Sequence, residues 1–239
     1  MVLSCSGIRK HFGGFVVLNE VSLTLGRAEI LGVAGPNGAG KTTLFDILSG
    51  HVRQDAGRVE LNGQDITSAP AYARARLGLG RTFQSPLVPS SLTVAETLTA
   101  ARLAWSPRLG IADVEKARAL ARLEADDRRL SAELDTLGRR KLLLACLLMR
   151  RPTVLMLDEP CSGLLQEEID EIDEVIRSIR DETGTAVIVV EHRLELLTAI
   201  AERVAVLDEG TKIAEGPPAE VFDDPAVRAA YFEAPSRAA

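Results

Sequence analysis

The segment that most constrains the fold of this chain is residues 35–42, Gly-Pro-Asn-Gly-Ala-Gly-Lys-Thr. It matches the phosphate-binding pattern G-x-x-x-x-G-K-[ST] at every fixed position. An apolar run of the length of a buried strand, Ile30–Ala34, precedes it, and Leu44, Ile47 and Leu48 follow it at helical spacing. The sequence therefore predicts a strand, a phosphate-binding loop and a helix in succession, which is the context that this pattern requires.

The residue types in this loop suit the binding of a polyphosphate. Glycines allow the backbone to curl around an anion and to direct successive N–H groups at phosphate oxygens. The Lys41 ammonium supplies a positive charge for the β- and γ-phosphates, and the Thr42 hydroxyl is a ligand for Mg²⁺. A glycine-rich turn that only links a strand to a helix is the alternative, which the full match in this context disfavours. The predicted nucleotide-binding residues are Gly35, Pro36, Asn37, Gly38, Ala39, Gly40, Lys41, Thr42 and Thr43.

The composition is that of a globular protein with enough apolar material for a core. Among 239 residues, 46% are hydrophobic and 26% are charged, which suits one domain. The longest apolar run, residues 142–149, is far shorter than the about 20 residues that a membrane-spanning helix needs, and no signal peptide is evident. We therefore expect the chain in the cytosol. The net charge of -6 disfavours non-specific binding of nucleic acid.

Predicted strands alternate with predicted helices along most of the chain. Apolar alternation within residues 2–26 and the turn signal Asn62-Gly63 predict antiparallel strands near the N-terminus. Later apolar runs predict buried strands, and amphipathic segments predict the helices between them. These elements are strands at 153–157 and 185–190, helices at 167–182, 193–201 and 218–232, and a hairpin of 204–207 with 212–214. The alternation predicts an α/β fold with a mostly parallel sheet and phosphate chemistry at the carboxyl ends of its strands.

From about residue 86 to residue 150 the composition changes, because alanine, leucine, arginine and glutamate dominate and β-branched runs disappear. Thr93-x-x-Glu96 matches a capping box that begins a helix. Residues 113–130 hold few strand formers, and residues 142–149 are apolar on every side, as in a buried helix. We expect one domain, 1–239, into which residues 86–150 are inserted as a small α-helical subdomain.

Asp158 and Glu159 follow directly on the strand predicted at 153–157. A carboxylate at the carboxyl end of a strand can hold Mg²⁺ directly or through water, and we expect this role for Asp158. Glu159 is then placed to polarise the attacking water as a general base. Two acids that only precede a turn at Pro160 are the alternative, but the upstream phosphate loop favours the functional interpretation.

Two further polar residues are candidates for the same site. Gln84 offers a neutral amide that can contact both Mg²⁺ and the attacking water. His192 follows the strand predicted at 185–190, where an imidazole can donate a hydrogen bond to the γ-phosphate. A glutamine or histidine taken alone more often has a structural role. The functional interpretation of Gln84 and His192 therefore depends on the phosphate loop and the acidic pair. The predicted catalytic residues are Glu159, His192, Gln84 and Lys41, and the predicted Mg²⁺ ligands are Thr42, Gln84 and Asp158.

The order of these motifs resembles that of the ATP-binding subunit of ABC transporters. The matching segments are residues 35–42, Gln84 after Arg-Thr-Phe, Leu-Met-Leu-Asp-Glu-Pro at 155–160, and Glu-His at 191–192. The resemblance covers nearly the whole chain and implies a P-loop ATPase fold that binds ATP and Mg²⁺. It also implies that Phe12 stacks on adenine, that Gln84 belongs to a loop facing a membrane permease, and that His192 is a switch residue.

A narrower resemblance concerns the transported substrate. Residues 35–45, 80–84 and the tail at 220–231 are similar to ATPases for the uptake of branched-chain and other hydrophobic amino acids. This resemblance implies a subunit that hydrolyses ATP to power an importer. It also implies a position on the cytoplasmic face of the cell membrane, transmembrane permease subunits as partners, and a second ABC ATPase subunit that clamps ATP head to tail. We expect no nucleic acid partner.

One region departs from the family pattern. The family carries an L-S-G-G-Q-like signature that binds the γ-phosphate held by the other subunit, where this chain reads Leu-Asp-Thr-Leu-Gly-Arg-Arg at 134–140. Aligned without a gap, Asp135 stands at the serine and Leu137 at a glycine, and a carboxylate repels a phosphate. With a one-residue deletion, Thr136 and Gly138 stand there instead and restore the hydroxyl and the backbone N–H. Both alignments stay open, and the unusual signature favours a heterodimer with a similar subunit over a homodimer.

Leu165 is a second departure, because the family usually has Asp or Asn at this position. Two other functions therefore stay open. The first is a regulatory or structural ABC subunit with little hydrolysis of its own, which Leu137 and Leu165 favour and the intact Glu159 and His192 disfavour. The second is a soluble ABC ATPase that acts on nucleic acid or ribosomes, which the acidic net charge and the lack of a long basic insertion disfavour.

Overall fold

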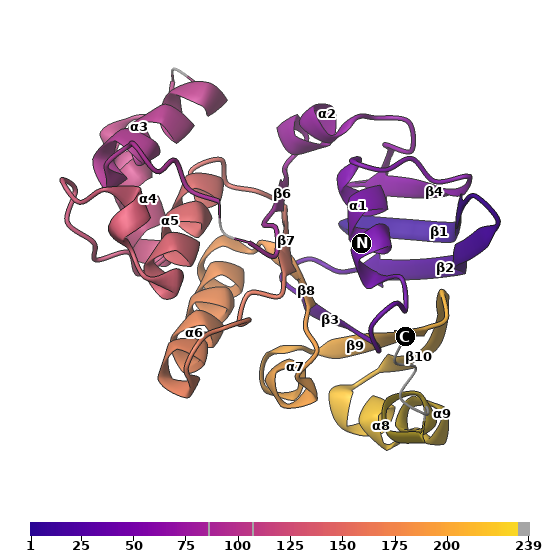
Figure 1. The fold of residues 1–239 in the computed structure, drawn as a ribbon. Helices are drawn as coiled ribbons and strands as arrows, with labels where there is room; N and C mark the ends of the chain where they lie inside the picture. The colour runs from indigo at the N-terminus through magenta and orange to yellow at the C-terminus, as the bar shows by residue number, and fades with distance from the viewer. Residues whose placement is uncertain (86, 107, 234–239) are drawn as a thin grey trace.

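Strands form two sheets in the computed structural model, which describes residues 1–85, 87–106 and 108–233 (Figure 1). In the described residues, an antiparallel sheet has the order β2-β1-β4-β5, formed by Phe15–Leu25, Leu3–Phe12, Ala56–Leu61 and Gln64–Asp65. The other sheet has the order β10-β9-β3-β8-β7-β6, formed by Thr211–Gly216, Arg203–Asp208, Ile30–Ala34, Ala186–Val190, Val154–Asp158 and Leu79–Arg81. Its neighbouring strands are parallel except β10 and β9, which confirms the predicted fold class.

Helices cover the second sheet and form a group beside it. In the described residues they are α1 (Lys41–Ser49), α2 (Ala71–Arg76), α3 (Val94–Trp105), α4 (Ile111–Leu120), η1 (Ser131–Glu133), α5 (Thr136–Leu148), α6 (Gln166–Thr183), α7 (Leu194–Ile200), α8 (Pro218–Asp223), α9 (Pro225–Arg228) and η2 (Ala229–Glu233). In Figure 1, α3, α4 and α5 lie together on one side of β6 and β7, and the antiparallel sheet lies on the other side. Pro86, at which the predicted helical insertion begins, lies outside the described residues.

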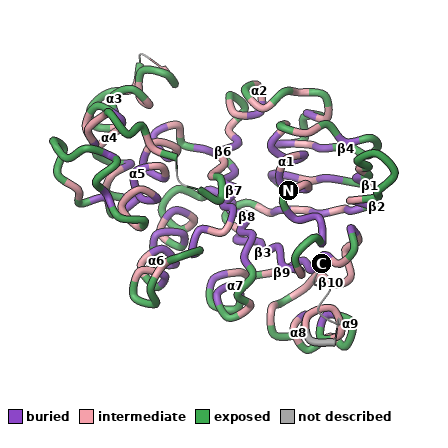
Figure 2. The backbone as a smooth tube through the Cα atoms, viewed as in Figure 1, coloured by how far each residue is buried: buried purple, intermediate pink, exposed green. Residues whose placement is uncertain are grey.

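The mostly parallel sheet is buried on both faces, because β3, β7 and β8 consist of buried residues throughout (Figure 2). Successive side chains of a strand point to opposite faces. Val154 and Met156 accordingly pack in one hydrophobic cluster with α1 and the antiparallel sheet. Leu155 and Leu157 pack in the other cluster with α5 and α6. The continuous apolar runs of the sequence are thus explained by burial between two layers.

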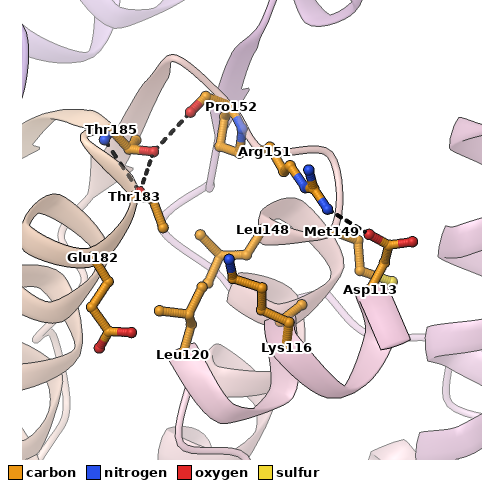
Figure 3. Close-up of a pocket in the computed structure, with 11 residues that line it drawn as sticks. Asp113, Lys116, Leu120, Leu148, Met149, Arg151, Pro152, Glu182, Thr183 and Thr185 are labelled. Carbon is orange, nitrogen blue, oxygen red and sulfur yellow. Dashed lines mark hydrogen bonds and ion pairs between the residues drawn. The ribbon is translucent and has the colours of Figure 1, made fainter. Parts of the chain in front are cut away.

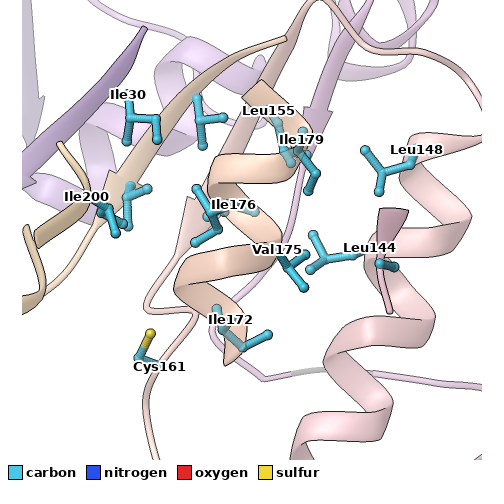
Figure 4. Packing of buried hydrophobic residues seen from close by; sticks show 14 of the residues in the cluster. Ile30, Leu144, Leu148, Leu155, Cys161, Ile172, Val175, Ile176, Ile179 and Ile200 are labelled. Atoms are coloured by element: carbon cyan, nitrogen blue, oxygen red, sulfur yellow. The ribbon is translucent and has the colours of Figure 1, made fainter. Parts of the chain in front are cut away.

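Helix α6 supplies much of the second layer through one apolar face. Ile172, Val175, Ile176 and Ile179 are buried and point toward the sheet and α5 (Figure 4). Burial of side chains of this size stabilises the fold by about 1.5–3 kcal/mol each. The predicted amphipathic helix at 167–182 is therefore confirmed, with ends one residue outside the expected ones.

The segment after α4 is not helical, which corrects the interpretation of residues 113–130. Helix α4 ends at Leu120, and Arg122 has a left-handed φ of 48°. The carbonyls of Asp127 and Arg129 instead accept hydrogen bonds from the N–H groups of Ala95 and Val94, at 3.1 and 2.9 Å. The non-helical segment after α4 therefore supplies hydrogen-bond acceptors for N–H groups in the first turn of α3, which have no partner within that helix.

The C-terminal tail is also not the single helix expected at 218–232. It is divided into α8, α9 and the π-helical turn η2. Pro225 has no N–H and begins a new helix, and the Asp224 carboxylate accepts a hydrogen bond from the N–H of Ala226 at 2.7 Å. The predicted capping box of Thr93 and Glu96 at the start of α3 is confirmed. Among the described residues, no helix is both long enough and apolar enough to cross a membrane.

Candidate active site

Four neighbouring strands, β3, β8, β7 and β6, bring the candidate residues to one edge of the sheet (Figure 1). These strands are parallel, so their carboxyl ends lie at the same edge. Residues 35–42 follow β3, His192 follows β8, Asp158 ends β7, and Gln84 follows β6. The topology therefore places segments that are far apart in the sequence beside the phosphate loop.

The phosphate loop holds the Lys41 ammonium close to its own backbone. Nζ of Lys41 donates hydrogen bonds to the carbonyls of Gly35 at 2.7 Å and Pro36 at 2.9 Å. Burial lowers the pKa of Lys41, while the carboxylates of Glu159 and Asp158 act in the opposite direction. The ammonium thus lies between the loop and the acidic pair, where it can be attracted by a phosphate anion.

Two glycines of this loop are required by close backbone contacts. Gly35 has a φ of 147°, and a Cβ atom there would lie 2.2 Å from the carbonyl oxygen of Leu207. Gly40 has a φ of 97°, and its Cβ would lie 2.8 Å from the carbonyl oxygen of Val17. The loop is therefore packed against β9 and β2. Its exposed residues are Asn37, Gly38 and Thr42, its partly exposed residues are Pro36 and Thr43, and its buried residues are Gly35, Ala39, Gly40 and Lys41.

Glu159 contacts two of the other predicted catalytic residues. Its Oε2 accepts a hydrogen bond from Nε2 of Gln84 at 2.8 Å, and its Oε1 lies against Nε2 of His192. Glu159 has a left-handed φ of 48°, and its N–H donates to the carbonyl of Val190 at 3.0 Å. Such a backbone conformation in a residue other than glycine costs about 1–3 kcal/mol and is common at functional sites. The sequence thus led correctly to three residues that share one cluster, while their catalytic roles stay predictions.

Asp158 faces a cation that the sequence did not single out. Its Oδ2 lies 3.3 Å from Nη2 of Arg81, and its N–H donates to Oγ1 of Thr82 at 3.2 Å. Burial raises the pKa of Asp158, whereas the Arg81 guanidinium lowers it. The sequence offered one indication of this ion pair, which is that Arg81 ends a short strand. A charge in such a position tends to be buried and then needs a counterion.

The residues present fit a hydrated Mg²⁺ ion. Thr42, Asp158 and Gln84 offer a hydroxyl, a carboxylate and an amide oxygen, which are the hard oxygen ligands that Mg²⁺ prefers. Thr42 is exposed beside the loop, so its hydroxyl is accessible. These residues would hold the ion, and the ion would neutralise charge on the phosphates.

Phe12 lies at the tip of the β1–β2 hairpin and is half exposed. The Lys10 ammonium lies over its ring, 5.2 Å from the centroid. The Asp55 carboxylate holds the end of β1 in place, because it accepts hydrogen bonds from Nζ of Lys10 at 2.9 Å and from the N–H of His11 at 2.6 Å. Val17, whose carbonyl borders the phosphate loop, lies in the strand that pairs with Phe12. The strand β2 thus runs from the hairpin that carries Phe12 to the phosphate loop.

Residues 134–140, where the sequence comparison predicts an altered signature, include the N-cap and the first turn of α5. Asp135 is the N-cap residue, and its Oδ1 accepts a hydrogen bond from the N–H of Gly138 at 2.7 Å. Thr136, the first residue of α5, is exposed, and Leu137 is partly buried. Further along α5, Arg140 donates to the carbonyls of Pro160 and Ser162 in the loop after β7. Thr136 and Gly138 therefore lie on α5, whereas Lys41 begins α1, Asp158 ends β7 and Glu159 follows it.

A separate cavity of about 200 Å³ lies between α4, the end of α5 and the end of α6 (Figure 3). Asp113 and Arg151 form an ion pair of 2.9 Å at its rim, and Oγ1 of Thr185 donates to the carbonyl of Pro152 at 2.8 Å. Both Pro152 and Thr185 lie just before a strand, so this cavity is at the amino ends of β7 and β8. It is therefore at the opposite edge of the sheet from the phosphate loop.

Comparisons with known proteins agree with this arrangement. Residues 18–162 match the family described as ABC transporter, and residues 211–232 match the family described as branched-chain amino acid ATP-binding cassette transporter. The chain is 34% identical over 249 residues to the high-affinity branched-chain amino acid transport ATP-binding protein LivG of Escherichia coli strain K12, with 97% of each chain covered. It is 32% identical over 248 residues to the corresponding protein BraF of Pseudomonas aeruginosa, again with 97% of each chain covered.

Solved structures give the same assignment. The crystal structure of an ATP-binding cassette of an ABC transporter in its ADP conformation matches with a TM-score of 0.86 and 26% identity. The match covers 96% of this chain and 98% of that one. Family, sequence relatives and fold therefore agree. The chain belongs to the ABC transporter family, as an ATP-binding subunit of its branched-chain amino acid group.

Proposed function

We propose that this chain hydrolyses ATP to drive the import of branched-chain or related hydrophobic amino acids through a separate permease. The contact of Glu159 with Gln84 and His192 beside the phosphate loop is the observation that carries the hydrolytic part of this proposal. The match of residues 211–232 and the printed names of the relatives support the substrate class. In this role the chain lies on the cytoplasmic face of the membrane.

In the proposed reaction each residue of the site has one task. Lys41 attracts the β- and γ-phosphates, and Phe12 stacks on the adenine ring. Thr42, Asp158 and Gln84 hold Mg²⁺, which supplies charge neutralisation when it is bound. Glu159 accepts the proton of the attacking water, and general-base catalysis of this kind is worth about 10²–10⁴-fold in rate. His192 holds the Glu159 carboxylate in place and donates to the γ-phosphate.

We infer that the permease contacts this chain beside Gln84. Phe83 directly precedes this residue and is 51% exposed, and Leu87, three positions after it, is 81% exposed, so two large apolar side chains near Gln84 face solvent. A contact here would reach Glu159 directly, because Gln84 donates its hydrogen bond to that carboxylate. Movement of the permease and positioning of the catalytic base would then be coupled through one side chain.

We further propose that the second ATP-binding subunit is a different chain with an intact signature. Asp135 already occupies the Gly138 N–H, so the carboxylate stands where the signature would bind a phosphate. Leu165 is 75% exposed at the start of α6 and offers no polar group to a partner. The ATP held by this chain would be hydrolysed against the signature of the partner, and the ATP of the partner would face Asp135.

Reconstitution tests this function. The permease that co-purifies with this chain is placed in proteoliposomes with both ATP-binding subunits and the substrate-binding protein, and the uptake of labelled leucine is measured. The proposal predicts uptake that needs ATP and is abolished by Lys41→Ala in this chain. Leucine uptake that is independent of ATP, or ATP hydrolysis with no transport of any hydrophobic amino acid, would contradict it.

A further inference from the structure

Arg81, the last residue of β6, joins three polar groups from two other elements. Its Nη1 donates hydrogen bonds to Oδ1 of Asp46 at 2.6 Å and to Oγ of Ser49 at 2.7 Å, both on α1. Its Nη2 lies 3.3 Å from Oδ2 of Asp158, at the end of β7. Helix α1 begins with Lys41, so one guanidinium connects the helix that follows the phosphate loop to the expected Mg²⁺ ligand.

The surroundings of Arg81 hold its guanidinium in one position. Its side chain is only 5% exposed, and it lies over the rings of Phe83 and Phe45, at 4.8 and 5.7 Å from their centroids. His51 packs edge-on against Phe83, and its Nδ1 lies 2.9 Å from Oγ of Ser49. Because the Arg81 side chain is largely removed from water, its ion pairs are stronger than they would be at the surface.

The ion pair with Arg81 orients the Asp158 carboxylate. The Asp158 side chain is 7% exposed, and its Oδ2 faces the guanidinium at 3.3 Å. The N–H of Asp158 donates to Oγ1 of Thr82 at 3.2 Å, so contacts with the β6 segment constrain both the backbone and the side chain of this residue. Mg²⁺ requires near-ideal octahedral geometry, so a rotated carboxylate is a poor ligand for it.

We propose that Arg81 is a positioning residue, which keeps the Asp158 carboxylate aligned with Lys41 and Thr42 for Mg²⁺. This inference rests on the proposed function, because it assumes that Asp158 meets the ion bound with ATP. The planar guanidinium of arginine suits this role, because its two terminal nitrogens contact α1 and β7 at the same time. A lysine has the same charge but lacks the two separate nitrogens, Nη1 and Nη2, with which Arg81 contacts α1 and β7.

The test compares the affinity for ATP with Mg²⁺ and with EDTA, measured by calorimetry on the full chain. For Arg81→Lys the affinity with EDTA stays within about twofold of wild type, and the gain in affinity from Mg²⁺ falls about tenfold or more, as expected when a hydrogen bond to a charged group is lost. Arg74→Lys is the matched control. Arg74 is also buried and contacts α1 through the carbonyls of Ile47 and Leu48, and within the described part of the chain its hydrogen bonds go to carbonyls rather than to a carboxylate.

Two further variants keep the result decisive. If Arg81→Lys does not fold, as judged by its thermal transition, Asp46→Asn weakens the contact with α1 by removing its charge and leaves Arg81 in place, and the Mg²⁺ gain should fall by a smaller factor. In an Asp158→Asn background, Arg81→Lys should cause no additional loss of the Mg²⁺ gain. A full Mg²⁺ gain in Arg81→Lys would overturn the positioning role alone. A wild-type chain that binds no ATP at all would instead overturn the proposed function.

Discussion

The Gln84 amide donates a hydrogen bond to the Glu159 carboxylate at 2.8 Å, across 75 positions of sequence. This contact joins the segment after β6 to the end of β7. It therefore links Gln84, which follows the exposed Phe83, with Glu159, the expected catalytic base.

The first prediction concerns this hydrogen bond. In Gln84→Ala the Glu159 carboxylate loses its amide partner, so turnover of the assembled complex should fall about tenfold to hundredfold, as expected for a hydrogen bond to a charged group. The affinity for ATP with EDTA should stay unchanged. Gln64→Ala is the control, because Gln64 is exposed on β5, at the edge of the antiparallel sheet. Equal effects of the two substitutions on turnover would contradict the prediction.

A second prediction concerns the adenine ring. Phe12→Ala removes the aromatic face at the tip of the hairpin, and a stacked base is worth about 1–3 kcal/mol, so the affinity for ATP should fall about 5- to 150-fold. Inorganic tripolyphosphate has no base, so its binding should be unaffected. Phe15→Ala removes the neighbouring aromatic side chain, which is 80% exposed, and should change neither affinity. Calorimetry with both ligands measures the difference, and equal losses for ATP and tripolyphosphate would rule out stacking.

The third prediction concerns the signature. If Asp135 repels the phosphate of a facing subunit, Asp135→Ser should increase ATP-dependent self-association of this chain. The measurement is the dimer fraction at saturating ATP in a Glu159→Gln background, which prevents hydrolysis. Asp126→Ser serves as the control, since Asp126 is also an exposed acid that accepts a backbone hydrogen bond. A dimer fraction in Asp135→Ser no larger than that of the control would show that this carboxylate does not limit dimer formation.

A buried acid on α6 gives a prediction about stability. Asp173 is almost wholly buried, and its Oδ1 has no hydrogen-bond partner among the residues that the structure describes. Burial raises the pKa of this carboxyl from 3.8 to about 6, and the Arg177 guanidinium only partly opposes the rise. Because the folded chain holds this proton more tightly than the unfolded chain, stability falls as the pH rises from about 4 to about 6, and the whole penalty is present above that range.

Asp173→Asn should remove this penalty. The free energy of unfolding should rise relative to wild type by up to about 3 kcal/mol at pH 8, and the gain should shrink by about 1–2 kcal/mol at pH 5. Chemical unfolding at the two pH values measures the gain. Glu167→Gln changes an exposed acid on the same helix that does not contribute to the Asp173 shift, and it should give no gain that depends on pH. A gain in Asp173→Asn that is the same at pH 5 and pH 8 would be evidence against the burial of a charge.

Local patterns predicted most of the sheet and indicated residues that the fold brings to one edge of it, while their roles stay predictions. The phosphate loop, the acidic pair after β7 and the apolar runs of β7 and β8 are each determined by neighbours in sequence, so periodicity and motif spacing were sufficient. The capping of α3 by Asp127 and Arg129 was missed, because it depends on a contact between distant segments. The division of the tail at Pro225 was a local signal that the helical interpretation overlooked.

The polar contacts around the site were the least accessible to sequence reasoning. Arg81 meets Asp46 and Asp158 only because parallel pairing places β6 beside β7 and α1 follows β3. Arg140 likewise reaches the loop after β7 from a different helix. No spacing rule encodes such pairs, since the partners lie tens of residues apart and a single arginine is an ordinary surface residue in most sequences.

The most direct test of the account is phosphate release by the assembled transporter with wild-type chain and with Glu159→Gln. The amide keeps the shape of the side chain and its contacts with Gln84 and His192 but cannot accept the proton of water. We expect ATP affinity within about twofold of wild type and turnover lower by about 10²–10⁴-fold. Wild-type turnover in the Glu159→Gln complex, with ATP bound, would contradict the assignment of Glu159 as the catalytic base.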